Sequence, residues 1–214
     1  MLLLLRHGQS ELNEQGALVG RSDPPLTPLG QAQAVAAGRA IAAGCAGAGH
    51  DVRLLTSPLG RARVTAQLVA DELRAAGVGV AVVIEHRLIE LDYGDYDGLQ
   101  PSQVPAEQWA LWRADSNYRP PRGESLCALH ARCEALWEEL QAAARGQGLD
   151  SPDVIAVSHV SPIKAAVAWA LGAGPEVAWR LQLPVASLTR IAFGRDQPAL
   201  SSFGEIGHLA GVTA

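Results

Sequence analysis

Short apolar runs alternate with longer segments of helical period along this chain, and that alternation restricts the fold more than any other feature. Runs such as "VIAV" are apolar at every position, which is typical of strands in a sheet covered by helices on both faces. The strands predicted in this way are Leu2–Leu5, Val52–Thr56, Val80–Ile84, Val154–Val157 and Leu188–Phe193. We therefore expect an α/β fold, a three-layer α/β/α sandwich with a mostly parallel central sheet, formed as one domain over residues 1–214.

The segments between these runs carry the start and end signals of helices. A hydroxyl residue followed by proline predicts an N-cap and a first helical residue, and such pairs occur at Thr27–Pro28, Ser57–Pro58 and Ser161–Pro162. Gly44 and Gly77 are expected just beyond the ends of the first two helices. A further amphipathic helix is predicted by apolar side chains that step by three and four residues, namely Leu126, Leu129, Cys133, Leu136 and Leu140.

The segment from about residue 91 to 122 breaks this rhythm. It contains "DYGDYDG" and "NYRPPRG" and shows little regular period. Its aromatic side chains are Tyr93, Tyr96, Trp109, Trp112 and Tyr118. One interpretation is a plain surface loop. The other, which we favour, is a short lid insertion that presents an apolar or ring-stacking wall to a pocket.

Composition excludes several classes of protein. A net charge of −5 leaves no broad basic face for nucleic acid. Cys45, Cys127 and Cys133 are odd in number and form no CxxC pair, which argues against a disulfide framework and a zinc knuckle. The run Leu2–Leu5 is shorter than the roughly 7–15 apolar residues of a signal peptide, and no run approaches the ~20 residues of a membrane span. We expect a cytoplasmic protein with no membrane partner.

Basic and polar side chains follow three of the predicted strands at the point where each strand ends. Arg6 and His7 follow the first, Arg61 and Arg63 open the helix after the second, and His159 follows a later one. Ligands of open α/β sheets bind beyond the carboxyl ends of the strands, so both histidines should meet the arginines at one edge. Arg63 is expected on the helix face opposite Arg61.

A cluster of this kind suits a phosphate monoester. The helix starts at Ser57 and Ser161 would offer free N–H groups, and arginine binds phosphate oxygens through its planar fork. A histidine beside arginines keeps a free ring nitrogen at neutral pH, and that nitrogen can attack phosphorus to form a phosphohistidine. Zinc is the alternative ligand of a histidine pair, but the adjacent arginines would repel a dication, so no metal is expected.

The leaving alkoxide also needs a proton, and Glu90 is the best candidate for the acid. It lies just before the lid segment, and Asp92, Asp95 and Asp97 follow closely. Like charge nearby would raise the pKa of its carboxyl group and help it to hold a proton. Glu85 is the rival acid, but it lies within the preceding strand pattern.

Five stretches then resemble the successive motifs of the histidine phosphatase superfamily, in the branch that contains the cofactor-dependent phosphoglycerate mutases. They are "LLLLRHGQSELNEQGALVGRSDPPLTPLGQAQA", "LLTSPLGRARVTA", "LIELDYGDYDG", "PRGESL" and "VIAVSHVSPIKAAV", in this order. The resemblance implies that His7 is the phosphorylated nucleophile and that Glu90 is the general acid and later the base. It also implies a catalytic phosphate pocket of Arg6, Arg61 and His159, with Asn13 as a further contact.

Two departures from the mutase pattern favour a hydrolase. The family commonly has glycine after the second histidine, and Val160 stands there, in a "SHVSPIK" form similar to the phosphatases grouped with α-ribazole phosphatase. The acidic "ELDYGDYDG" replaces the "ERHYG"-like stretch of the mutases, which favours water as the phosphoryl acceptor. We expect a phosphomonoesterase that acts on a small phosphorylated metabolite and uses no cofactor.

Two alternatives remain open. One is a cofactor-dependent phosphoglycerate mutase, which would need 2,3-bisphosphoglycerate for priming. The other is a catalytically inactive sensor of phosphorylated ligands. The sequence leaves the oligomeric state open, with a homodimer among the options.

Overall fold

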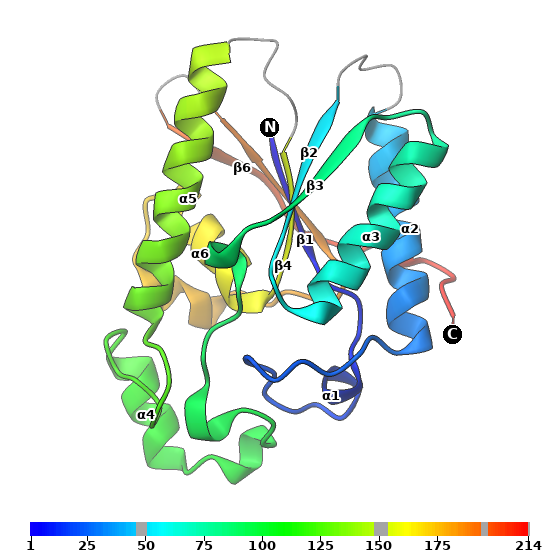
Figure 1. Ribbon diagram of the computed structural model, residues 1–214. Coiled ribbons are helices and arrows are strands. Elements are labelled where there is room, and N and C mark those ends of the chain that lie inside the picture. The colour runs from blue at the N-terminus through cyan, green and yellow to red at the C-terminus, as the bar shows by residue number, and fades with distance from the viewer. Residues whose placement is uncertain (46–50, 148–153, 194–196, 214) are drawn as a thin grey trace.

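A six-stranded sheet forms the centre of the molecule in the computed structural model, which describes residues 1–45, 51–147, 154–193 and 197–213 (Figure 1). The strand order is β3-β2-β4-β1-β5-β6. The strands are β1 (Leu2–Arg6), β2 (Val52–Thr56), β3 (Val80–Ile84), β4 (Val154–Ser158), β5 (Leu188–Ala192) and β6 (Ala199–Glu205).

The sheet is mostly parallel, as the sequence predicts. Strands β3, β2, β4 and β1 pair in parallel, whereas β5 and β6 add an antiparallel edge beside β1. Strand β6 is the one that the sequence analysis missed. Its sequence "ALSSFGE" has little apolar content, because it is an edge strand and its side chains are exposed or only half-buried.

Helices cover both faces of the sheet and complete the three layers. Figure 1 shows α5 and α6 on one face and α2 and α3 on the other. Consecutive leucines of β1 point alternately to the two faces of the sheet. Leu2 and Leu4 pack in the core that contains α5, whereas Leu3 and Leu5 pack in the core beneath α2 and α3. The α-helices are α1 (Glu11–Glu14), α2 (Pro28–Cys45), α3 (Gly60–Ala75), α4 (Ala106–Ala114), α5 (Leu126–Gln147) and α6 (Val160–Leu171).

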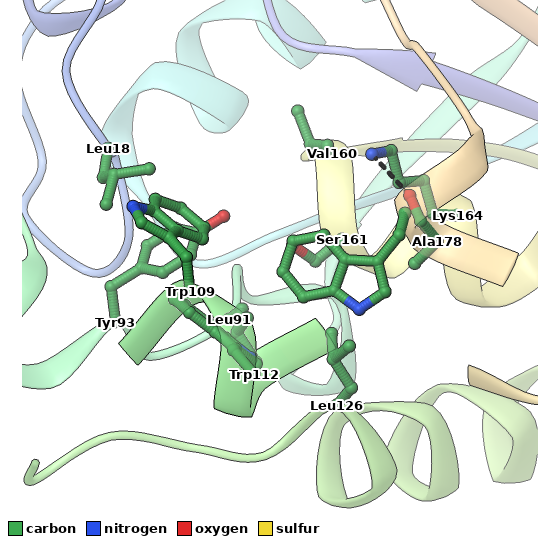
Figure 2. A pocket seen from close by; sticks show the side chains of 11 residues that line it. Leu18, Leu91, Tyr93, Trp109, Trp112, Leu126, Val160, Ser161, Lys164 and Ala178 are labelled. Carbon is green, nitrogen blue, oxygen red and sulfur yellow. Dashed lines mark hydrogen bonds between the residues drawn. The ribbon is translucent and has the colours of Figure 1, made fainter. Parts of the chain in front are cut away.

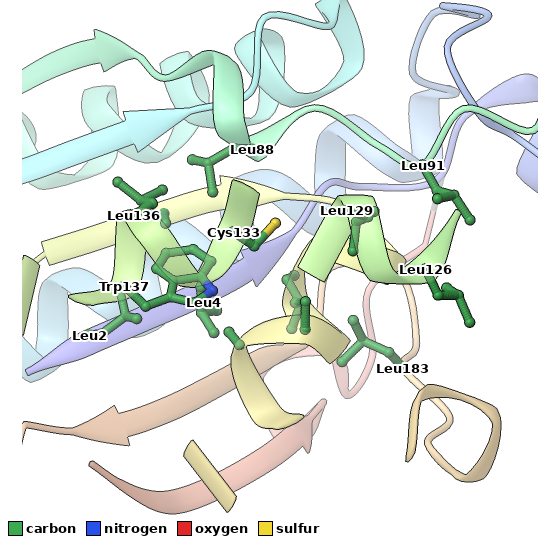
Figure 3. Packing of buried hydrophobic residues seen from close by; sticks show 14 of the residues in the cluster. Leu2, Leu4, Leu88, Leu91, Leu126, Leu129, Cys133, Leu136, Trp137 and Leu183 are labelled. Carbon is green, nitrogen blue, oxygen red and sulfur yellow. The ribbon is translucent and has the colours of Figure 1, made fainter. Parts of the chain in front are cut away.

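The apolar stripe predicted for α5 is confirmed. Figure 3 shows its side chains directed at the sheet, beside Leu2 and Leu4 of β1. The five predicted members, Leu126, Leu129, Cys133, Leu136 and Leu140, are all buried. Trp137 is buried with them, so the stripe is wider than the sequence pattern indicates.

Two of the three predicted helix starts are wrong. Thr27 is an N-cap as expected, since its Oγ1 accepts from the N–H of Gly30 at 3.0 Å. In contrast, α3 begins at Gly60 rather than at Pro58, and α6 begins at Val160, before Ser161 and Pro162. Both starts depend on carboxylates from distant segments, which local sequence signals do not reveal.

The predicted helix ends are half right. Gly77 has a positive φ of 79° and follows α3, as expected of a terminating glycine. Gly44 lies inside α2, which continues to Cys45.

Residues 91–122 contribute no strand and lie beyond the carboxyl ends of β1 and β4, at the same end of the molecule as α1 (Figure 1). The segment is more regular than its sequence suggests, because it contains α4 and the 3-10 helices η2 (Gly94–Tyr96) and η3 (Pro101–Gln103). Trp112 of α4 is only 1% exposed, and Leu18 exchanges backbone hydrogen bonds of 2.8 Å with Leu99 and Gly98. The segment is therefore a packed wall rather than a plain loop.

No helix among residues 1–45, 51–147, 154–193 and 197–213 is long and apolar enough to cross a membrane.

Two glycines allow β1 and α2 to approach closely behind the strand end. A Cβ on Gly30 would collide with the carbonyl oxygen of Gln9, and a Cβ on Gly8 would collide with the carbonyl oxygen of Gly30. Gly8 is thus required by this backbone contact.

Gly30→Ala should therefore lower the free energy of unfolding by about 1–3 kcal/mol, the usual cost of overpacking. Gly44→Ala is the matched control in the same helix, because a Cβ there meets nothing within 4 Å. The free energy of unfolding of the Gly44→Ala control should not fall, and it should rise by up to about 1 kcal/mol. Urea denaturation checks both, and equal midpoints for the two variants would contradict the close approach.

Candidate active site

The carboxyl ends of β1 and β4 bring two histidines together, as the sequence predicts. His7 follows β1 and His159 follows β4, and their ring centroids lie 5.0 Å apart. The N–H of His7 donates to the carbonyl oxygen of Ser158 at 3.0 Å, which continues the pairing of the two strands up to the site. Both histidines are almost completely buried.

Hydrogen bonds define the tautomer of His7. Its Nδ1 lies 2.7 Å from the carbonyl oxygen of Gly8. A carbonyl oxygen only accepts, so Nδ1 carries the proton and Nε2 carries the lone pair. Arg61 Nε donates to that Nε2 at 3.2 Å. Burial, followed by the charges of Arg61 and Arg6, holds the pKa of His7 well below its ordinary value. The ring is neutral, with its lone pair beside an arginine.

Arg61 is the most firmly held side chain of the site. Its side chain is buried, and its Nη1 and Nη2 donate to the carbonyl oxygens of Ser22 at 2.7 Å and Gly20 at 2.8 Å. Arg63, two residues along α3, is exposed, which confirms that the two arginines lie on different faces of the helix.

Asp23 caps the N-terminus of α3, which the sequence analysis assigned to Ser57. Its Oδ2 accepts from the N–H of Gly60 at 2.5 Å and its Oδ1 from the N–H of Arg61 at 3.3 Å. Oδ1 also lies 3.6 Å from Nη1 of Arg61. The expectation of a free helix N-terminus for phosphate is therefore wrong at α3, because a carboxylate already occupies it.

Glu90 occupies the N-terminus of α6 in the same way. Its Oε1 accepts from the N–H of Ser161 at 3.2 Å and from its neighbour Leu91 at 2.6 Å. The carboxyl group is buried, and this burial raises its pKa, although those N–H groups and the arginines Arg61 and Arg6 oppose the shift. Glu90 is thus a buried carboxyl group with a raised pKa at the edge of the site.

Desolvation, rather than neighbouring aspartates, causes that shift. Asp97 accepts from the N–H groups of Gly20 and Ser22, and Asp92 accepts from the N–H of Gly94, so both stabilise loops. The proposed like-charge effect of these aspartates is therefore wrong. The rival acid, Glu85, is paired with Arg87 at 2.7 Å, and this pairing lowers its pKa.

Arg6 and His159 complete the cluster and keep polar atoms without protein partners. Arg6 Nη1 donates to the carbonyl oxygen of Leu183 at 2.5 Å, whereas its buried Nε has no partner in the described chain. Burial lowers the pKa of Arg6 to about 10, so the side chain stays charged at neutral pH. His159 Nε2 lies 2.7 Å from Ser57 Oγ, and its Nδ1 is buried without a partner among the described residues.

Asn13 lies in α1, in a capping box with Ser10. Its Oδ1 accepts from the N–H and the hydroxyl group of Ser10 at 3.1 and 2.9 Å. These two bonds fix the amide group of Asn13 through its oxygen. A phosphate contact for Asn13 stays a prediction.

An apolar cavity of about 170 Å³ adjoins this polar cluster. Figure 2 shows Leu18, Tyr93 and Trp109 on one side of it and Val160, Ser161 and Lys164 on the other. Its walls are Leu18, Leu91, Tyr93, Trp109, Trp112, Leu126, Val160, Ser161, Lys164, Ala178 and Trp179. Three of the aromatic residues of the predicted lid line the cavity, whereas Tyr96 and Tyr118 instead bind Gln108 behind it.

Sequence reasoning missed Asp23, Lys164 and Trp179 in this region, and it placed Ser57 at a helix start without its contact to His159. Asp23 and Ser57 act through side chains that reach distant backbone or ring atoms, and no local pattern reveals such contacts. Lys164 and Trp179 come from α6 and the 3-10 helix η5 (Pro175–Arg180), outside the predicted lid. The unexplained tryptophan in "EVAWR" was the available signal for Trp179.

Fold and site together define the class: an α/β sandwich with a pair of histidines and two arginines at the strand ends. The chain matches the Histidine phosphatase superfamily (branch 1) over residues 2–206. It therefore belongs to this superfamily, as its motifs predict.

Its relatives include both kinds of enzyme that the sequence left open. A 2,3-bisphosphoglycerate-dependent phosphoglycerate mutase of Brucella melitensis is 36% identical over 179 residues, which cover 82% of this chain and 83% of that protein. A mycobacterial glucosyl-3-phosphoglycerate phosphatase has a similar structure, with a TM-score of 0.82 at 29% identity over 96% of this chain and 99% of that chain.

A longer relative is also similar. A bifunctional protein of Mycobacterium tuberculosis is 36% identical over 203 residues, which cover 91% of this chain and 50% of that protein. The chain thus spans about half the length of this relative.

Removal of the Asp23 carboxylate from the N-terminus of α3 should destabilise the protein. Asp23→Ala should lower the free energy of unfolding by about 0.5–2 kcal/mol, because the first N–H groups of α3 lose their acceptor. Asp71→Ala in the same helix is the control, since Asp71 is exposed and its bonds to Gln67 and Arg74 lie on the surface of that helix. Its cost should stay within about 0.5 kcal/mol. Urea denaturation measures both, and a neutral Asp23→Ala would exclude the capping role.

Proposed function

We propose that this protein is a phosphomonoesterase that hydrolyses a small phosphorylated metabolite through a phosphohistidine on His7. The observation that carries the proposal is the tautomer of His7. With Nδ1–H bound to Gly8, the lone pair lies on Nε2, where it accepts from Arg61 Nε. The ring can attack phosphorus once a substrate displaces this hydrogen bond.

In the first half-reaction, Nε2 of His7 attacks the phosphorus atom and the bond from phosphorus to the ester oxygen breaks. Glu90 gives its proton to that oxygen, so an alcohol leaves and a carboxylate remains. Arg6, Arg61 and His159 surround the phosphoryl group and stabilise the charge on its oxygens in the transition state. Arg61 contributes without rearranging its two Nη groups, because backbone carbonyl groups already hold them.

In the second half-reaction, the Glu90 carboxylate takes a proton from water, and the oxygen of this water attacks phosphorus. The bond between phosphorus and Nε2 breaks, and inorganic phosphate and neutral His7 are released. Glu90 is protonated again, so the cycle closes without a metal ion or a cofactor.

Charge around the site favours water over a second phosphorylated substrate. A mutase primed by a bisphosphate needs cations for two phosphoryl groups. Among the described residues that line the cavity, Lys164 is the one cation. The guanidinium groups of Arg21 and Arg132 do not line it, and they share the carboxylate of Glu124 at 3.5 and 2.8 Å. The cavity walls themselves are mainly apolar.

The phosphoglycerate mutase remains the second candidate because a mutase is 36% identical to this chain. Assays with p-nitrophenyl phosphate and 3-phosphoglycerate separate the two. Release of inorganic phosphate from the first without isomerisation of the second supports the phosphatase. Efficient isomerisation primed by 2,3-bisphosphoglycerate would overturn it, and no turnover of a broad ester panel would indicate a sensor.

His7→Ala should abolish both turnover and the acid-labile phosphoenzyme, because the nitrogen that bonds to phosphorus is lost. Rapid quenching with a ³²P-labelled ester measures the intermediate. His86→Ala is the matched control, since His86 is exposed and outside the cluster. Retained labelling in His7→Ala would exclude His7 as the nucleophile.

Both limbs of the pH profile of kcat/KM should differ from those of an ordinary histidine and an ordinary glutamate. His7 must be neutral, and its pKa is lowered, so activity should rise at a pH below the ordinary titration of histidine. Glu90 must be protonated, and its pKa is raised, so activity should persist above the ordinary titration of glutamate and fall as pH passes the raised pKa.

Glu90→Gln tests whether Glu90 causes the fall of kcat/KM at high pH. It should slow alkyl esters by about 100-fold and remove the fall at high pH, because no acid remains to titrate. The rate of hydrolysis of p-nitrophenyl phosphate should fall much less, since its leaving group needs little protonation. An equal loss on both esters would exclude Glu90 as the acid.

A further inference from the structure

The apolar cavity lies next to Glu90, because the two share the residue Ser161. Ser161 forms part of its wall, and the N–H of the same residue donates to the Glu90 carboxyl group at 3.2 Å. If Glu90 protonates the ester oxygen, as proposed above, the carbon attached to that oxygen points toward this wall. The cavity is therefore where the rest of the alcohol would lie.

Aromatic rings from separate segments line this space. Trp109 and Trp112 of α4 stack with centroids 5.5 Å apart and planes 16° from parallel. Trp179 of η5 stands nearly perpendicular to both, at 6.3 and 5.7 Å. Arg113 holds these elements together, with its guanidinium 5.8 Å from the Trp109 ring and 5.9 Å from the Trp179 ring. These contacts hold the rings of the wall in a fixed arrangement.

The volume fits a single ring system. An apolar cavity of about 150 Å³ in an engineered protein stays dry and takes up benzene, and this cavity measures about 170 Å³. Sugars and short hydroxy acids need many hydrogen-bond partners, whereas leucine and aromatic side chains make up most of this wall. The buried Nε1 groups of Trp112 and Trp179 have no partner among the described residues, so a flat ring with few polar atoms suits the space better than a sugar or a hydroxy acid.

Lys164 adds a charge to one side of the cavity. Its Nζ donates to the carbonyl oxygen of Ala178 at 2.9 Å, as Figure 2 shows. An ammonium group has three donors, so two remain. No carboxylate forms an ion pair with Lys164 in the part of the chain that the structure describes. Its charge would repel a cationic ring and favour an acceptor atom on a neutral or anionic one.

We propose that the alcohol released from the substrate carries a planar, non-cationic aromatic ring, which lies in this cavity against Trp109 and near Lys164. The ring is the part of the substrate that the enzyme selects. This inference rests on the proposed phosphatase activity, because it assigns the leaving group of that reaction.

Chain-matched alkyl phosphates test the ring. 2-Phenylethyl phosphate should have a kcat/KM at least about tenfold above that of ethyl phosphate, the range that one stacked ring provides. 2-Cyclohexylethyl phosphate, which is apolar but puckered, should fall at least threefold below the phenyl ester. 4-Phenylbutyl and butyl phosphate repeat the comparison with a longer spacer. Equal values with and without a ring at both spacers, or equal phenyl and cyclohexyl values, would overturn the proposal.

Trp109→Leu should reduce the ratio of phenyl to ethyl ester below about threefold. Trp169→Leu is the matched control, because Trp169 packs against Phe193 and does not line the cavity. The control should keep the wild-type ratio. A ratio measured within one variant is independent of the fraction of folded protein, so partial misfolding does not mimic the result. An unchanged ratio in Trp109→Leu would exclude the stacking contact.

A charged ring tests Lys164. 2-(4-Aminomethylphenyl)ethyl phosphate should have a kcat/KM at least about tenfold below that of the unsubstituted phenyl ester, and Lys164→Met should narrow this difference. Equal values for the two esters in the wild-type protein would contradict the role of the charge.

Binding separates this inference from the proposed function. Calorimetry with 3-phenylpropylphosphonate and propylphosphonate needs no turnover. Tighter binding of the phenyl compound supports the ring site even if every ester is inert, in which case only the phosphatase proposal falls. Turnover of ethyl phosphate with labelling of His7 but no preference for any ring would leave the phosphatase standing and remove the ring site.

Discussion

The buried guanidinium of Arg61 is the contact on which the site depends. It binds the lone pair of His7 at the end of β1 and two backbone carbonyl oxygens of the segment that precedes α2. Its backbone N–H is capped by Asp23 from the same segment. One side chain thus fixes a strand end, a loop and a helix start relative to one another. The two bonds to carbonyl oxygens can persist through the proposed reaction, whereas the bond to His7 must be released before Nε2 attacks phosphorus.

Burial then sets the protonation states in opposite directions. The pKa of His7 is lowered and that of Glu90 is raised, and desolvation is the largest cause of both shifts. Removal from water disfavours the charged form of each group, so the same environment shifts both groups toward their neutral forms. The imidazole of His7 and the carboxyl group of Glu90 are therefore both shifted by one cause, their burial.

Much of this arrangement follows from the sequence, because hydrophobic pattern and strand ends are local properties. The bounds of β2 and β3 are as predicted, and His7, Arg61 and His159 meet at one sheet edge. The helix starts of α3 and α6 were not predictable, since carboxylates from residues distant in sequence supply their caps. Strand β6 was missed because an exposed edge needs no apolar pattern. The superfamily assignment is confirmed, whereas the role of Asn13 and the likeness to α-ribazole phosphatases stay predictions.

Part of the cavity wall comes from segments that carry none of the proposed reacting groups. Trp109 and Trp179 lie on α4 and η5, whereas His7, Arg61 and Glu90 lie at the ends of strands or the start of a helix. Substitutions in α4 or η5 can therefore accumulate without touching the bonds that fix His7. Descendants of one ancestral chain could in this way change the alcohol they accept while the phosphorus chemistry is inherited intact, which makes this separation a route for functional divergence.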